Sequence, residues 1–214
     1  MTRIDSVAGS PDRAGRHLVK FSDGQTMKLY RQTIEDFALY PGLELSGEQL
    51  DALRENAGAV SAKMRAVRIV AASSVSKRDL QRRLVNKGED PEQARQAVAW
   101  MEELKLVDDR ETARQIVARC AAKGYGVARA KQALYEKQIP KACWEDALED
   151  YPDQTDYILK FLRGRIADPA EPSQVRRAVD ALMRRGHSYG QVRRCLEQLG
   201  SDAEEFPEDD EWQK

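Results

Sequence analysis

The sequence contains few of the side chains that form metal centres and redox sites. Its 214 residues include two histidines, His17 and His187, and three cysteines, Cys120, Cys143 and Cys195, with no CxxC pair. Each cysteine lies in an apolar helical pattern, so we interpret all three as buried small hydrophobic residues in a reducing compartment. Neither histidine has a partner at metal-ligand spacing. We therefore expect no metal and no cofactor.

Long apolar segments and catalytic motifs are also missing. No run of about 18 apolar residues is present, and the first residues lack the apolar core of a signal peptide. We therefore expect a cytoplasmic protein without membrane contact. The run Lys123–Gly126 matches a glycine-rich phosphate loop only weakly, because it follows a helix, and we interpret it as a helix end plus a turn. We assign Asp108 and Asp109 to helix capping rather than metal binding. The sequence predicts a protein that is not an enzyme.

Charge is unevenly distributed although the net charge is −1. Residues 59–140 hold 17 lysines and arginines against 10 acidic residues, and the remainder holds 18 against 26. The last residues, 201–214, hold seven acidic residues against one lysine, and we expect them to form a disordered acidic tail. A basic centre is compatible with binding to a polyanion or an acidic protein surface, but solvated helix faces have the same composition.

The N-terminal residues 1–58 are predicted to form a small appendage with a β-hairpin and helices. Residues 1–15 look like a loose start, and strands at 16–21 and 25–30 face each other across Ser22-Asp23-Gly24. A helix over residues 32–39 is expected to end at Pro41-Gly42. Ser46 and Gln49 form a capping box that opens a helix over residues 47–56, closed by Gly58.

Helical patterns continue from Val60 nearly to the end, and several starts carry capping residues. Ser76 is followed by Asp79 at the third helical position. Asp90, Pro91 and Gln93 supply an N-cap, a first-turn proline and a capping-box partner. The pairs Asp108 with Glu111 and Ser188 with Gln191 follow the same pattern. These signals indicate a chain that is mainly helical.

An internal repeat organises these helices. Leu84, Leu134 and Leu182 align at offsets of 50 and 48 residues, followed three residues later by a basic residue and then by Gly88, Gln138 or Gly186. Leading helices are expected at 62–72, 110–122 and 155–166. The sequence therefore predicts a mainly α fold of tandem three-helix repeats, with three units at 59–107, 108–152 and 153–200. Because Gln138 does not favour the left-handed backbone of the aligned glycines, we expect Pro140 to define that turn.

Basic side chains are the candidate contacts for nucleic acid or for a protein filament. They come from all three units: Lys77, Arg78, Arg82, Arg83, Lys87, Lys123, Arg129, Lys131, Lys137, Arg176, Arg177, Arg184 and Arg185. A row of basic helix ends could follow a phosphate backbone, or each could complement its own helix dipole. We expect Trp100 and Trp144 in the core, and consider base stacking for Tyr125 and Tyr189.

Several short motifs, in order, resemble the RecX regulatory protein family. They are Ser76-Lys77-Arg78-Asp79-Leu80 with Leu84 and Lys87-Gly88, then Leu104 to Asp109, then Lys123-Gly124-Tyr125-Gly126 with Leu134 and Lys137. The match covers about residues 60–150, and the N-terminal hairpin also looks like an appendage that relatives carry. Departures are Gln138, where the family usually has glycine, and Val107, inserted before the paired aspartates.

The resemblance implies a function as well as a fold. Members of the family consist of three-helix repeats, bind the RecA recombinase filament on DNA, and suppress its recombinase, coprotease and ATPase activities, which places them in recombination, DNA repair and the SOS response. It implies the RecA filament as partner, with single-stranded DNA as a further candidate. We expect the chain to be a monomer. Within this reading, Arg78, Arg82 and Arg83 are our hypothesis for filament contact.

Two other classes of function stay open. A stand-alone helical nucleic-acid-binding protein would use arginine-rich helices on DNA, although the net charge and the acidic tail oppose this. A helical scaffold in another complex would make the basic residues incidental. Salt-dependent binding to DNA without recombinase would indicate the first, and absence of any effect on recombinase would favour the second.

Overall fold

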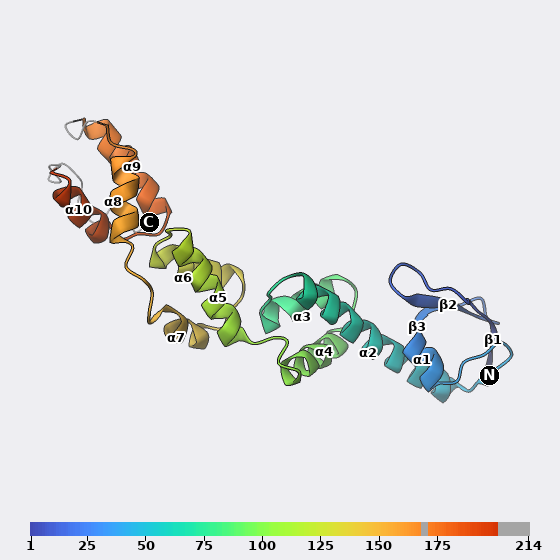
Figure 1. Cartoon of the computed structure of the whole chain (residues 1–214). Helices are drawn as coiled ribbons and strands as arrows, with labels where there is room; N and C mark the ends of the chain where they lie inside the picture. The colour runs from blue at the N-terminus through green and yellow to red at the C-terminus, as the bar shows by residue number, and fades with distance from the viewer. Residues whose placement is uncertain (168–170, 201–214) are drawn as a thin grey trace. The chain divides into compact units, whose positions relative to one another are not determined.

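The chain divides between Val107 and Asp108 into two units, each with its own apolar clusters. The computed structural model describes residues 1–167 and 171–200 (Figure 1). The division falls at the boundary expected between the first and second repeats. The acidic tail expected at residues 201–214 lies outside the described residues.

The N-terminal part of the first unit is a four-stranded antiparallel sheet with the order β3-β2-β1-β4. Its strands are β1 (Thr2–Val7), β2 (Arg16–Phe21), β3 (Thr26–Tyr30) and β4 (Glu44–Leu45). The predicted hairpin is confirmed as β2 and β3. The loose start expected for residues 1–15 is wrong in part, because β1 pairs with both β2 and β4. This strand was not predicted because most of its side chains are polar, and Ile4 is its one fully buried residue.

The first helix, α1 (Arg31–Asp36), ends before Pro41. Ala38 adopts a left-handed backbone with φ of 47°. The Leu39 N–H donates to the Ile34 carbonyl over 2.9 Å, which closes the helix end. The end predicted at Pro41-Gly42 is therefore wrong, and a local turn stops the helix earlier.

Helix α2 (Gly47–Ala72) runs for 26 residues without interruption, so the helix end predicted at Gly58 is wrong. Gly58 marks a packing site instead of a cap. A Cβ atom at Gly58 would lie 2.1 Å from the Gln93 side chain of α4 (Pro91–Glu103). Buried residues continue on both sides of it at helical spacing, from Leu50 to Ala66. The expected limit between residues 58 and 59 thus falls inside one helix, which packs on the sheet and on α4.

Three groups of helices follow the sequence repeat, and the mainly α fold with an N-terminal appendage is confirmed. The second half of α2 packs with α3 (Lys77–Asn86) and α4, and α5 (Asp109–Ala122) packs with α6 (Val127–Glu136), a 3-10 turn η1 (Lys141–Cys143) and α7 (Trp144–Leu148). The third group is α8 (Thr155–Arg163), α9 (Pro172–Arg184) and α10 (Tyr189–Gln198). The aligned Leu84, Leu134 and Leu182 are each fully buried in their own group.

The aligned helices α3, α6 and α9 end in the same way. In each, the aligned leucine carbonyl accepts the N–H of the residue five positions later: Glu89 at 3.1 Å, Ile139 at 3.0 Å and His187 at 3.2 Å. The residue directly before each of these donors has a left-handed backbone, with φ of 88° at Gly88, 56° at Gln138 and 86° at Gly186. The expectation that Pro140 defines the middle turn is wrong, because Gln138 itself adopts the left-handed backbone.

Most predicted helix starts are confirmed. Ser46 and Ser188 form capping boxes with Gln49 and Gln191, and Ser76, Asp90 and Asp108 accept backbone N–H groups. The capping-box role predicted for Gln93 is wrong, because its side-chain amide donates to the Glu55 carbonyl over 3.3 Å. In the described part of the chain, no helix combines the length and apolarity needed to cross a membrane.

Candidate nucleic-acid or filament interface

Two of the three arginines in our contact hypothesis bind a buried carboxylate. Asp79 lies in the first turn of α3 and is 2% exposed. Arg82 pairs with its Oδ1 atom, and Arg83 pairs with its Oδ2 atom at 2.8 Å. Arg78 is exposed, and no described carboxylate lies within ion-pair distance of it. The charge available to a partner on this helix is therefore smaller than the sequence indicates.

Some of the remaining predicted basic residues in the first two repeats are also paired with a carboxylate. Lys77 binds Glu102 of α4 over 2.7 Å, and Arg129 binds Glu136 over 3.3 Å on its own helix. Lys87, Lys123, Lys131 and Lys137 are exposed. For Lys87, Lys123 and Lys131, no carboxylate among the described residues lies within ion-pair distance. These exposed lysines are separated along the chain and belong to different helices.

In the third repeat, Arg185 is held inside the fold. Its Nη1 atom donates to the Tyr157 hydroxyl over 2.5 Å. Its guanidinium lies 5.8 Å from the ring centroids of Tyr125 and Tyr157, and 5.3 Å from that of Phe161. The aromatic contacts tie this side chain to residues of the second and third repeats. Its place in the sequence repeat beside Lys87 and Lys137 gave no sign of this.

Helix α9 carries the densest group of exposed arginines among the predicted residues. Arg176, Arg177 and Arg184 lie on the side of the helix opposite its buried residues Val175, Ala178, Val179 and Leu182. Arg177 and Arg184 are seven positions apart and so share one stripe. No carboxylate among the described residues lies within ion-pair distance of these three guanidinium groups. We call these three residues the α9 arginine stripe.

The glycine-rich run Lys123–Gly126 is a helix end plus a turn, as predicted. Gly124 is left-handed with φ of 67°, and Gly126 is the N-cap of α6. The Gly126 N–H donates to the Arg185 carbonyl over 2.9 Å, and the Ala128 N–H donates to the Gly186 carbonyl over 3.2 Å. Carbonyls from the end of α9 thus bind N–H groups of the α6 N-terminus, where a phosphate would otherwise have to bind.

His187 completes this contact between the second and third repeats. It is 3% exposed, and its Nε2–H group donates a hydrogen bond to the Gly124 carbonyl over 3.0 Å. Its Nδ1 atom is buried without a described partner. Burial lowers the pKa of His187, and the nearby Arg185 charge lowers it further, while the bond to Gly124 opposes the shift. The imidazole is therefore a neutral structural group.

Cys120 and Cys195 lack the environment of reactive thiols. Burial raises the pKa of the Cys120 and Cys195 thiols, so both stay protonated at neutral pH. Cys143 is only partly buried, which corrects the expectation of burial for that residue. Among the described residues, no group of three or more His, Cys, Asp or Glu side chains is arranged to hold a metal ion.

The four aromatic residues considered from the sequence all pack against apolar clusters, and each is partly buried. Tyr125 packs on the core of the second repeat and Tyr189 on that of the third, and both rings are partly buried, so base stacking by either stays a prediction. Trp144 packs as predicted, and its indole N–H donates to the Ile139 carbonyl over 3.0 Å. Tyr135 of α6 is 72% exposed. Its exposure was not predicted, because residue spacing along a helix does not distinguish an exposed tyrosine from a packed one.

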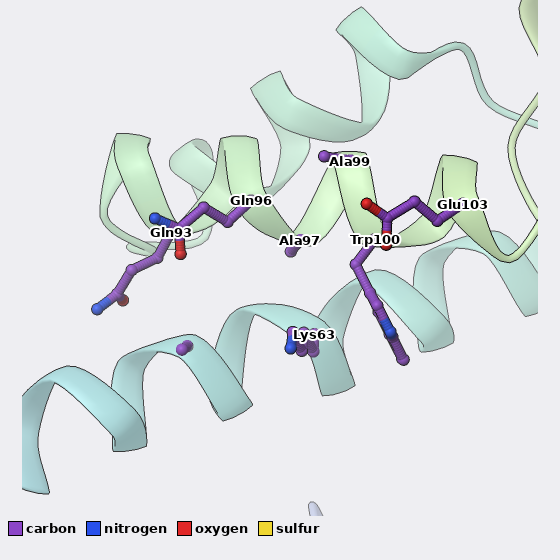
Figure 2. A pocket seen from close by; sticks show the side chains of 8 residues that line it. Lys63, Gln93, Gln96, Ala97, Ala99, Trp100 and Glu103 are labelled. Carbon is purple, nitrogen blue, oxygen red and sulfur yellow. The ribbon is translucent and has the colours of Figure 1, made fainter.

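Trp100 packs against the apolar cluster of the first repeat, as predicted, and is partly buried. It lines a groove of about 330 Å³ between α2 and α4, together with Ala59, Gln96 and Glu103 (Figure 2). The Lys63 Nζ atom lies 5.3 Å from the ring centroid of Trp100. Figure 2 shows both side chains among the residues that line the groove. The groove carries charges of both signs, from Lys63 and Glu103.

Comparison with known proteins accounts for this architecture. Residues 108–148 match the family described as "RecX, second three-helix domain". The chain is 30% identical over 134 residues to regulatory protein RecX of Stenotrophomonas maltophilia (strain K279a), which covers 61% of this chain and 82% of the relative. The chain belongs to the RecX family of regulatory proteins. The resemblance stated from the motifs is therefore confirmed.

Other RecX proteins extend the match. Regulatory protein RecX of Halorhodospira halophila (strain DSM 244 / SL1) is 27% identical over 158 residues, covering 71% of this chain and 97% of that protein. A crystal structure of regulatory protein RecX superposes with a TM-score of 0.64 at 19% identity, covering 92% of this chain and all of that chain. The structural likeness shows that this chain shares the fold of that protein over most of its length. This chain is thus a RecX-type regulator.

Proposed function

We propose that this protein binds the RecA filament on single-stranded DNA and thereby lowers the recombinase, ATPase and coprotease activities of RecA. Membership of the RecX family carries this proposal. The exposed basic residues on α3, α6 and α9 support it, because a filament of DNA and protein offers phosphates and carboxylates along its length. The protein acts by occupying the filament as a monomer in the cytoplasm, without chemistry of its own and without a cofactor.

The α9 arginine stripe is the best-supported contact among the predicted residues. Its three guanidinium groups are available, whereas Arg82, Arg83, Arg129 and Arg185 are engaged within the fold. Distributed weak contacts of this kind act together when a partner repeats along a polymer. The secondary filament contacts in this proposal are Arg78, Lys87, Lys123 and Lys131. Contacts through Lys77 and Lys137 remain predictions from the sequence.

The test is ATP hydrolysis by RecA on single-stranded DNA, titrated with this protein. We expect a dose-dependent fall at less than one molecule per RecA protomer. The triple variant Arg176→Ala, Arg177→Ala, Arg184→Ala should need about ten-fold more protein for the same inhibition, as expected from the loss of several phosphate or carboxylate contacts.

A matched control removes three exposed arginines that are already paired on their own helices: Arg31 with Glu35, Arg95 with Glu92, and Arg114 with Glu111. The triple alanine variant at these positions should inhibit like the unmodified protein. Full-strength hydrolysis at a molar excess of folded protein would refute the proposed function.

Direct binding to nucleic acid is the second candidate function, because the same exposed basic residues would contact phosphates. Fluorescence anisotropy with a labelled 30-nucleotide oligo(dT), without recombinase, measures it. Affinity that falls steeply between 50 and 200 mM NaCl would favour this candidate. Absence of binding, together with inhibition of RecA, would leave the filament protein as the principal contact.

A further inference from the structure

Helix α6 carries an aromatic side chain that does not take part in packing the second repeat. Tyr135 is 72% exposed, although it directly follows the fully buried Leu134. It lies outside the apolar cluster of the repeat, whereas Tyr125 and Tyr151 pack against that cluster. Within the described part of the chain, its hydroxyl has no hydrogen-bond partner, and no cation or aromatic ring lies over its ring. The ring is therefore available to a ligand.

The ring belongs to a stripe of exposed residues on α6. Ala128, Lys131 and Tyr135 are exposed at intervals of three and four positions, so they share one side of the helix. Ala130 and Leu134 are buried on the other side. The Cβ atoms of residues four positions apart in a helix are about 5–6 Å from each other. The Lys131 ammonium group and the Tyr135 ring can therefore contact the same ligand.

The charge along this stripe is positive, because the one carboxylate of α6 is already bound. The Glu136 Oε1 atom accepts hydrogen bonds from Arg129 over 3.3 Å and from Gln132 over 3.0 Å. No carboxylate among the described residues lies within ion-pair distance of Lys131. An anionic ligand that lies along α6 thus meets an unpaired cation beside an accessible aromatic ring.

Single-stranded nucleic acid offers the two groups that match this stripe. Each of its bases presents an aromatic face that can stack on a tyrosine ring, and each nucleotide carries a phosphate for a nearby lysine. In an intact duplex the bases are stacked on one another, and exposing one of them costs free energy. The stripe therefore fits a single strand better than a duplex.

We infer that α6 binds single-stranded DNA through Tyr135, whose ring stacks on a base, and Lys131, whose ammonium group binds the phosphate of that nucleotide. The inference deepens the proposed function and rests on it for its role, since the strand bound would be the one inside the RecA filament. The binding step itself does not require RecA. It is independent of base sequence, because every base has an aromatic face.

Fluorescence anisotropy of the full chain with two labelled probes separates base stacking from charge. One probe is the 30-nucleotide oligo(dT), and the other is an abasic strand with the same number of phosphates and no bases. We expect the unmodified chain to bind oligo(dT) at least about five-fold more tightly, the lower end of what stacking on one aromatic side chain contributes. Tyr135→Ala should remove this preference without weakening binding to the abasic strand, and Tyr135→Phe should keep it.

Two further variants test the phosphate contact and the specificity of the effect. Lys131→Ala should weaken binding to both probes alike and reduce the slope of log affinity against log salt concentration by about one. Tyr40→Ala is the matched control, because Tyr40 is 57% exposed in the first unit. It should change the affinity for neither probe.

Equal affinity of the unmodified chain for the two probes would overturn the inference, and so would a preference for oligo(dT) that survives Tyr135→Ala. Absence of binding to both probes would overturn it as well, while inhibition of RecA by the same preparation would leave the proposed function standing. Base-dependent binding without any inhibition of RecA would show that the proposed function is wrong and that this site still stands.

Discussion

At the scale of single residues, the charge that a surface side chain offers to a partner depends on whether a buried group of the fold already binds it. Arg82 and Arg83 look like solvent-facing basic residues in the sequence, yet both neutralise the buried Asp79. Arg78, on the same helix, has no such partner among the described residues. A basic cluster read from sequence therefore contains residues of two kinds, and only their burial and pairing distinguish those that serve the fold from those available to a partner.

Removal of both Asp79 partners should destabilise the first unit. We expect the double variant Arg82→Ala, Arg83→Ala to lose about 2–4 kcal/mol of unfolding free energy, because a buried carboxylate is left without a counter-charge. Arg78→Ala should change stability by less than about 0.5 kcal/mol. Urea unfolding followed by circular dichroism measures both. Equal stability of the two variants would contradict the structural role given to this pair.

The left-handed turn at Gln138 is another residue-scale feature. A glutamine in this backbone is strained relative to glycine, which the first and third repeats use at the aligned positions. The repeat pattern located the turn correctly, but the preference of the residue type led to the wrong turn residue. The backbone hydrogen bond from Ile139 to Leu134 holds the turn in place in spite of this strain.

At the scale of elements, the α6 N-terminus and the α9 C-terminus form one interlocked contact. Gly126 has no side chain to cap its helix, and its N–H is instead bound by the Arg185 carbonyl. A Cβ atom at Gly126 would lie 2.0 Å from the Gly186 carbonyl oxygen. The glycine is thus required by the close approach of two backbones from different repeats.

Gly126→Ala should therefore destabilise the second unit strongly. We expect a loss of about 2–4 kcal/mol, because backbone on both sides has little freedom to move aside. Thermal unfolding at neutral pH is the measurement. Gly190→Ala in α10 is the control: a Cβ there meets no atom within 4 Å, so its stability should be unchanged or slightly higher. A Gly126→Ala protein as stable as the control would show that the two helix ends can separate freely.

At the scale of the whole molecule, the chain consists of two units whose apolar clusters are separate. The contact around Gly126, Arg185 and His187 lies entirely within the second unit and joins its two repeats. Stability of that unit should consequently respond to the one buried imidazole in the contact. This gives an expectation for pH dependence that differs between the two units.

The second unit should lose stability as the pH falls below about 6.5. The pKa of His187 is lowered in the folded chain, so between that value and the ordinary value of 6.5 the unfolded chain binds a proton that the folded chain does not. Stability from this group is complete above pH 6.5 and declines towards the folded-state pKa. Urea unfolding at pH 5.5 and 7.5 measures the difference, which His187→Gln should reduce. An unchanged difference in that variant would assign the effect to other groups.

The sequence alone determined the helices, their caps and the three-fold repeat, because these depend on spacing between residues close in the chain. The buried leucines, the aligned helix ends and the family followed from such local patterns. Tertiary structure alone decided that β1 is a strand, that Gly58 lies inside a helix, and which basic residues are free. Each of these depends on a partner far away in sequence: β2 and β4 for the strand, Gln93 for the glycine, and the aromatic rings around Arg185. Side-chain pairing is set by packing in space, so only the fold shows which charges of the sequence are left unpaired among the described residues.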